Sequence, residues 1–112
     1  MRYNVLTRNN DFVRAYTRGK AYVNSQAVLY VNKNRAGKTR VGIVSSKKIG
    51  NAVTRNRARR VLRAALWQIM PKEIGSYDIV VVARGQTAKC KSWQVAKALK
   101  KLFNNAGLLQ DD

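Results

Sequence analysis

The sequence contains no histidine, a single cysteine and only five carboxylates, and these scarcities exclude several kinds of chemistry. Without histidine, no side chain titrates near neutral pH in its unperturbed state, and Cys90 has no imidazole to activate it as a nucleophile. No spacing of the carboxylates indicates an acid and base pair or a metal cage. The five carboxylates are Asp11, Glu73, Asp78, Asp111 and Asp112. We therefore expect no catalytic residue and no metal ligand, although the sequence leaves open whether Asp11 and Asp78 meet in the fold.

Long apolar runs, repeats and Pro- or Ser-rich linkers are also missing. A membrane-spanning helix needs about 20 consecutive apolar residues, and no stretch approaches that length. The N-terminus runs into polar residues from Asn9 onward and lacks the apolar core of a signal peptide. A lone cysteine permits no internal disulfide and fits a reducing compartment. For a chain of 112 residues, these features predict one cytoplasmic domain, residues 1–112, without a membrane or small-molecule partner.

Positive charge is what the chain has in excess. There are 23 Lys and Arg against five Asp and Glu, a net charge of +18, and no carboxylate occurs between Phe12 and Lys72. Such a field repels itself, so the working state is expected to be a complex with a polyanion. Nucleic acid is the polyanion that fits best, because arginine forks suit phosphate contact and stack on bases.

The charge is densest in residues 45–63, which hold seven cations and no carboxylate. Asn51 is a suitable N-cap for a helix that starts at Ala52 and continues to Met70, where Pro71 predicts its end. At 100° per residue, apolar residues fall on one arc and polar or basic residues on the other. The basic arc consists of Asn56, Arg57, Arg59, Arg60 and Arg63, with Arg55 near its margin. A solvated helix face is the alternative, but such faces usually mix charges of both signs at i, i+4 spacing.

The remaining pattern predicts a helix, three strands, the basic helix, a strand and a final helix. The first helix has Thr7 or Asn9 as its cap and ends at Gly19, and Ser92 is the expected cap of the last one. The expected elements are a helix to residue 18, strands at 20–24, 27–32 and 40–46, a helix at 52–70, a strand at 77–83 and a helix at 92–105. The unbroken apolar run from Ile79 to Val82 indicates a strand buried on both faces. Trp93 is interpreted as a packing residue.

A specific resemblance rests on the basic stretch. The run Lys47-Lys48-Ile49-Gly50-Asn51-Ala52-Val53-x-Arg55-Asn56-Arg57-x-x-Arg60 resembles the signature of the bacterial ribonuclease P protein subunit. The resemblance extends to Asp11-Phe12 ahead of Gly19 and to the late run from Tyr77 to Val81. One departure is Ala64, where the family often carries a carboxylate.

The resemblance implies the fold. It is an α+β, single-domain two-layer α/β sandwich of order αβββαβα, with a four-stranded mixed sheet and a left-handed βαβ crossover, of the ribosomal protein S5 domain 2-like type. General rules alone would make that crossover right-handed.

The resemblance also implies the function. The protein would assist Mg²⁺-dependent removal of the 5′ leader from precursor tRNA, with the metal-binding active site in a catalytic RNA subunit. Residues expected to bind that RNA are Lys47, Lys48, Asn51, Arg55, Asn56, Arg57, Arg59, Arg60 and Arg63. Residues expected to line a groove for the single-stranded leader are Phe12, Tyr16 and Tyr30. The partners are therefore the RNA subunit and precursor tRNA.

Three other classes stay open at this stage. A small ribosomal protein would have the same charge and no active site. A helix-turn-helix protein would read DNA with the arginine helix, but no short helix precedes it in the pattern. A ribonuclease with a protein active site would cleave without any added RNA.

Overall fold

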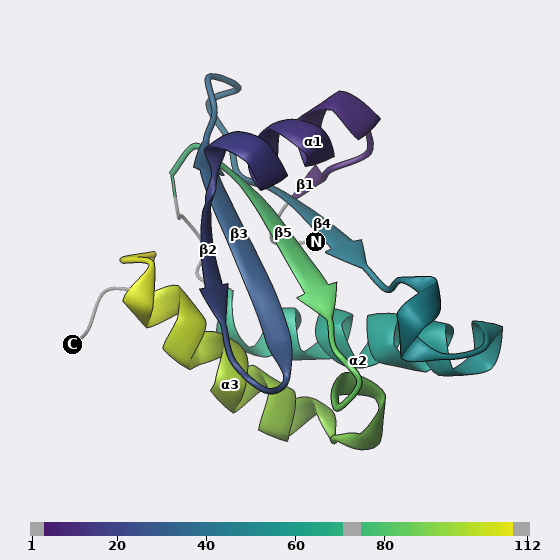
Figure 1. The fold of residues 1–112 in the computed structure, drawn as a ribbon. Coiled ribbons are helices and arrows are strands. Elements are labelled where there is room, and N and C mark those ends of the chain that lie inside the picture. Colours follow the sequence, from purple (N-terminus) through teal and green to yellow (C-terminus); the bar gives the residue numbers. More distant parts are fainter. Residues whose placement is uncertain (1–3, 71–74, 109–112) are drawn as a thin grey trace.

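The computed structural model describes residues 4–70 and 75–108, which form a five-stranded mixed sheet with helices on both faces (Figure 1). The strands are β1 (Asn4–Val5), β2 (Lys20–Val23), β3 (Ala27–Lys33), β4 (Arg40–Val44) and β5 (Tyr77–Ala83). The helices are α1 (Asn9–Arg18), α2 (Ala52–Ile69) and α3 (Ser92–Asn105), and short 3-10 turns occur at η1 (Lys47–Ile49) and η2 (Thr87–Lys89). Apart from β1, this is the predicted order, and the α+β class is confirmed.

β5 is the central strand of the sheet, whose order is β1-β4-β5-β3-β2. β4 runs parallel to β5, and β3 runs antiparallel to β5 along its whole length. β2 completes the predicted hairpin with β3. β1 pairs in parallel with β4, which makes the sheet one strand wider than the four strands predicted. Two residues are too few to leave a period-two pattern, so only the pairing reveals this strand.

The two faces of the sheet are covered by different helices. α2 and α3 lie on one face and enclose the larger hydrophobic core, to which β3 and β5 contribute Leu29 and Val81. α1 lies on the other face, over a smaller cluster that includes Ala15, Tyr30 and Val80. The prediction had two layers, one of strands and one of helices, and α1 adds a short third layer on the other face of the sheet. Because both faces are covered, β5 can be apolar at successive positions, as the sequence indicated.

The connection from β4 through α2 to β5 is a left-handed crossover (Figure 1). This hand is rare, so the family resemblance predicted it where the general rule would not. α2 begins at the predicted residue, because the Asn51 side chain accepts a hydrogen bond from the Thr54 N–H at 2.9 Å. Gly50, just before this cap, has a φ of 146°, which disfavours any residue with a side chain. Met70 caps the C-terminal end, and Pro71 lies outside the described residues.

Two helix starts differ from the prediction. α1 is capped by Arg8, without a side-chain hydrogen bond, and α3 is capped by Lys91, whose N–H donates to the Gln94 side chain at 2.8 Å. Gly19 does end α1, but its φ of −78° is not left-handed. A Cβ at Gly19 would lie 2.4 Å from the Ala15 carbonyl oxygen, so close packing explains the glycine. Within the described residues, no helix is both long and apolar enough to cross a membrane.

Candidate nucleic-acid interface

One side of α2 carries the predicted cations. We call the set Arg55, Asn56, Arg57, Arg59, Arg60 and Arg63 the arginine face. Arg57, Arg60 and Arg63 are exposed, whereas Arg59 is half-buried. The other side of α2 packs in the core through Ala58, Leu62, Ala65 and Leu66. The sequence therefore predicted correctly which side of this helix packs and which faces outward.

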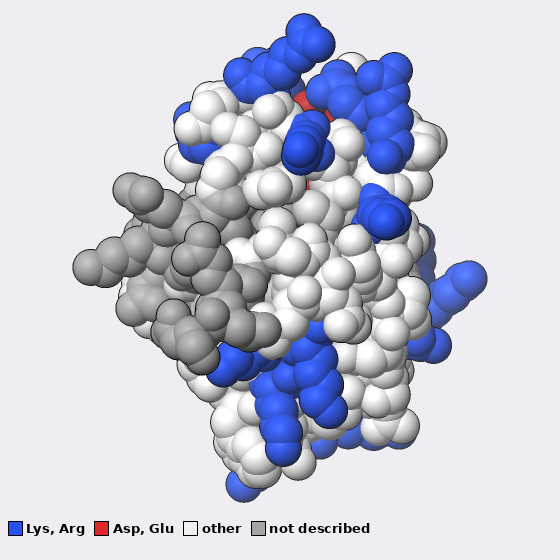
Figure 2. Space-filling view, turned by 90° about the vertical axis from the view of Figure 1, so that its left-hand side faces the viewer, with Lys and Arg blue, Asp and Glu red and all other residues white. Residues whose placement is uncertain are grey.

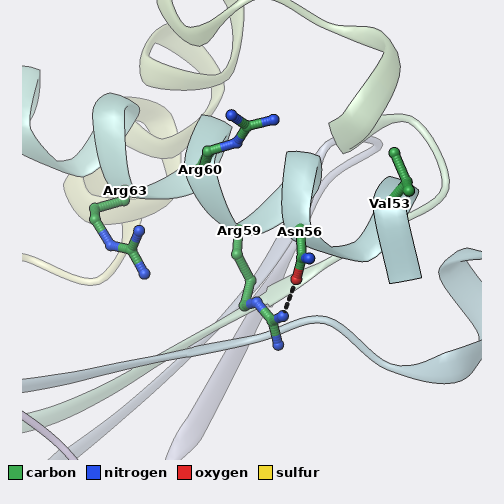
Figure 3. A pocket seen from close by; sticks show the side chains of 5 residues that line it. All are labelled: Val53, Asn56, Arg59, Arg60 and Arg63. Atoms are coloured by element: carbon green, nitrogen blue, oxygen red, sulfur yellow. Dashed lines mark hydrogen bonds between the residues drawn. The ribbon is translucent and has the colours of Figure 1, made fainter. Parts of the chain in front are cut away.

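The arginine face borders a hollow of about 580 Å³ (Figure 3). Its lining residues are Val53, Asn56, Arg59, Arg60 and Arg63. The Arg59 guanidinium donates a hydrogen bond to Asn56 Oδ1, which fixes the direction of that arginine. In Figure 3, Arg59 and Arg63 extend the same way, and Arg60 extends toward the other side of the helix. Val53, for which the sequence predicted no role, is 69% exposed and gives the hollow an apolar end.

The residues at the start of α2 play different parts. Lys47 and Lys48 are exposed in η1, where the chain turns from β4 toward α2. Asn51 uses its side-chain oxygen to cap the helix, so its predicted contact with RNA has only the amide NH₂ available. Arg55 is half-buried, and its Nε atom is buried without a hydrogen-bond partner. Arg55 therefore lies deeper than the exposed arginines and presents less of its fork to the outside.

The two carboxylates among the described residues, Asp11 and Asp78, form ion pairs with arginines outside the arginine face. Asp78 is fully buried and receives two hydrogen bonds from Arg40, Nε to Oδ1 at 2.8 Å and Nη2 to Oδ2 at 2.9 Å. Asp11 accepts from Arg40 at 3.4 Å and from Arg14 at 3.3 Å. Asn34 also donates to Asp78 at 2.7 Å. The hydrogen bond to Asp78, more than its charge, raises the pKa of Arg40, whereas burial alone would lower it.

This pairing has two consequences for the interface. Asp11 and Asp78 do come close, but each is neutralised by arginine, so they make neither an acid and base pair nor a cation site. Among the described residues, no group of three or more His, Cys, Asp or Glu side chains is placed to hold a metal ion. In residues 4–70 and 75–108, the arginine face has no carboxylate beside it, and its charge faces outward uncompensated.

The three residues predicted to bind a single strand come together on the α1 side of the sheet. We call Phe12, Tyr16 and Tyr30 the aromatic patch. The rings of Tyr16 and Tyr30 are 4.9 Å apart between centroids and meet edge to face at 79°. Phe12 is half-buried and packs, as Tyr30 does, against the smaller hydrophobic cluster under α1, whereas Tyr16 is 40% exposed. Burial, and to a lesser degree the neighbouring Tyr30, raises the pKa of Tyr16, so this phenol is neutral at physiological pH.

Known proteins that resemble this chain identify its family. The ribonuclease P family model matches residues 1–107. The chain belongs to the ribonuclease P protein family. It is 36% identical over 109 residues to a ribonuclease P protein component of Clostridium botulinum, covering 96% of this chain and 98% of that one.

Solved ribonuclease P proteins have the same fold. The structure of the Staphylococcus aureus protein matches with a TM-score of 0.81 and 32% identity, covering 94% of this chain and 96% of that one. The Thermotoga maritima protein matches with a TM-score of 0.76 and 26% identity, covering 96% and 99%. As a ribonuclease P protein, the chain is a subunit of an endoribonuclease holoenzyme that acts in tRNA 5′ processing together with an RNA subunit.

A second basic surface of this ribonuclease P protein lies outside the family signature. Trp93, predicted to pack, is instead 60% exposed at the start of α3. It lines a hollow of about 460 Å³ with Lys97, Lys101 and the turn at residues 24–26. Figure 2, which shows the left-hand side of the view in Figure 1, has Lys and Arg side chains in separate groups, and little of the surface of the described residues in this view is acidic. The signal that could have found this site is the spacing of Trp93, Lys97 and Lys101, four residues apart on one side of a helix.

Proposed function

We propose that this chain is one RNA-binding domain, residues 1–112, with two working surfaces. The arginine face, entered through Lys47, Lys48 and Asn51, docks on the catalytic RNA subunit. The aromatic patch holds the unpaired 5′ leader of precursor tRNA. The complex removes that leader and leaves the mature 5′ end. Because these RNAs are made and processed in the bacterial cytoplasm, the protein acts there.

The observation that carries the proposal is the uncompensated charge of the arginine face. Arg57, Arg60 and Arg63 are exposed, and the carboxylates of the described residues are paired with Arg14 and Arg40 instead. Arginine forks bind phosphate oxygens in pairs, and a folded RNA offers phosphates in a fixed arrangement. Recognition would therefore depend on RNA shape and backbone more than on base sequence.

The aromatic patch has the chemistry for an unpaired strand. Base stacking on an aromatic ring tolerates any sequence, because every base presents a π face. Leaders differ in sequence from one precursor to another, so a sequence-tolerant contact suits them. The edge-to-face contact of Tyr16 with Tyr30 holds both rings in place before a strand arrives.

The Mg²⁺ ions that the reaction needs would be held mainly by the RNA subunit and the substrate. The side chains of the described residues do not fit a dedicated magnesium site, because Asp11 and Asp78 are already paired with arginine. When bound there, the ions would supply stabilisation of the negative charge that develops at the scissile phosphate. The contribution of this chain is to neutralise backbone charge and to orient the substrate.

A cleavage assay tests the proposal. The purified chain, free of nucleic acid, is incubated with precursor tRNA and Mg²⁺, first alone and then with the transcribed RNA subunit. We expect no cleavage by the chain alone, and faster cleavage by the mixture than by the RNA alone at moderate salt. Cleavage by the nucleotide-free chain, or no effect of the chain on the RNA at any salt concentration, would contradict the proposed function.

A further inference from the structure

The hollow beside Trp93 combines an exposed aromatic ring with two lysines. Its lining residues from α3 include Trp93, Lys97, Ala98 and Lys101, and the turn between β2 and β3 forms the other wall. Trp93 is 60% exposed, although burial of an indole ring is one of the largest gains available to a core. The core therefore does not use this side chain, and its position is open to a partner.

The wall opposite Trp93 is held rigidly. The Asn24 side chain accepts hydrogen bonds from the N–H groups of Gln26 and Ala27, each at 3.0 Å. Its amide NH₂ donates to the carbonyl of Ala98 on α3, also at 3.0 Å. Arg84 donates to the Asn24 carbonyl at 3.0 Å. The bond to Ala98 ties the turn to α3, and the other three hold the shape of the turn, so the hollow exists before any ligand binds and little ordering entropy is lost on binding.

The charge of the hollow favours an anion. Lys97 and Lys101 are exposed, and none of the lining residues is acidic. The two lysines are one helical turn apart, about 6 Å along the axis, which approximates the spacing of neighbouring phosphates in a nucleic-acid strand. A flat aromatic ring next to two ammonium groups is the combination that single-strand binding sites use.

We propose that this hollow binds one unpaired nucleotide of the catalytic RNA subunit. The base stacks on the indole of Trp93, and the flanking phosphates contact Lys97 and Lys101. This inference rests on the proposed function, in which the RNA subunit docks on α2. It adds a second point of attachment, which would fix the orientation of the protein on the RNA.

The placement of α3 favours the RNA subunit over the leader as the source of that nucleotide. α3 covers the same face of the sheet as α2, which carries the arginine face, whereas the aromatic patch lies on the opposite face. Gln68 near the end of α2 donates a hydrogen bond to Ser92 at 3.3 Å, and Trp93 is the next residue. The RNA that contacts α2 is thus the one nearer to this hollow.

Fluorescence gives a direct test, because the chain has only two tryptophans. In the W67F variant, Trp93 is the sole indole. Titration with the RNA subunit should quench its emission, as base stacking on the ring requires. Emission that is unchanged at saturating RNA, with binding confirmed by a filter assay, would overturn the proposal.

The affinity of variants for the RNA subunit provides a second test. W93A should weaken binding of the RNA subunit roughly tenfold, and W93F should restore most of the affinity because a ring remains for stacking. K97Q/K101Q should reduce the slope of log affinity against log salt by about 1.4, the value for two phosphates of a single strand. The matched control is K33Q/K38Q, with the same charge change at exposed positions that do not line the hollow.

The possible results distinguish a failure of the Trp93 site from a failure of the proposed function. Unchanged affinity of W93A for the RNA subunit overturns the site, and so does a W93A defect confined to leader-bearing substrate in the assembled holoenzyme. An equal loss in W93F and W93A also overturns it, because stacking would then not be the cause. Suppose that removing the charges of Arg59 and Arg60 leaves holoenzyme assembly intact, whereas W93A impairs it. Docking of the RNA subunit on α2 would then be contradicted, and nucleotide binding beside Trp93 would be supported.

Discussion

The ring of Phe12 lies directly against the backbone of Gly42 in β4. A Cβ built at Gly42 would come within 2.4 Å of Phe12 Cε1 and 2.5 Å of Cζ, closer than any real contact. Glycine weakens a strand interior, so its presence in the middle of β4 needs a reason, and close approach of the phenylalanine ring supplies one. The position of α1 on the sheet, and with it the aromatic patch, depends on this contact.

Substituting G42A should therefore displace Phe12 and destabilise the protein. Overpacking of a filled site costs about 1 to 3 kcal/mol in the free energy of unfolding, measured by urea denaturation. G85A is the matched control, because no atom lies within 4 Å of a Cβ at that position and its φ is not positive. A G42A protein as stable as the G85A protein would show that the ring does not press on β4 as described.

The buried pair of Arg40 and Asp78 should matter more than the pair of Arg14 and Asp11, whose arginine is exposed. D78N leaves the half-buried Arg40 guanidinium without its two charged hydrogen bonds, and breaking such a pair costs about 3 kcal/mol or more. R14Q removes an ion pair whose arginine is 47% exposed, which should cost less than about 1 kcal/mol. Urea denaturation of both variants at neutral pH measures the difference, and equal losses would contradict the assignment.

The sequence predicted the start, the end and the packed side of α2 almost completely. The N-cap residue, the amphipathic period and the family signature all indicate a helix over the same residues. The sequence could not predict that Asp11 and Asp78 meet, because the two residues are 67 positions apart in the sequence and meet through Arg40, which contacts both. The exposure of Trp93 was also missed. An aromatic residue in the first turn of an amphipathic helix packs or projects according to what covers that turn, and only the tertiary arrangement decides this.

Charge removal on the arginine face should weaken holoenzyme assembly in a salt-dependent way. Each phosphate contact contributes about 0.9 to the slope of log affinity against log salt, so R59Q/R60Q should lower that slope by about 2. The K33Q/K38Q protein carries the same net charge and should keep nearly the full slope. Filter binding of the RNA subunit from low to moderate salt provides both values. Equal slopes for the two variants would mean that only net charge attracts the RNA. They would contradict the prediction that the RNA docks on the arginine face.

Phe12 should affect precursor tRNA and mature tRNA differently. If its ring stacks on or borders the leader, F12A should weaken binding of leader-bearing substrate to the assembled holoenzyme by roughly tenfold and leave mature tRNA affinity almost unchanged. F12L is the control for packing, since leucine retains much of the contact with Gly42 but offers no π face. A leader defect in both variants would indicate stacking, whereas a defect in F12A alone would indicate that Phe12 only positions α1. Equal weakening of both substrates by F12A would show that the aromatic patch does not contact the leader, because only a leader contact distinguishes the two RNAs.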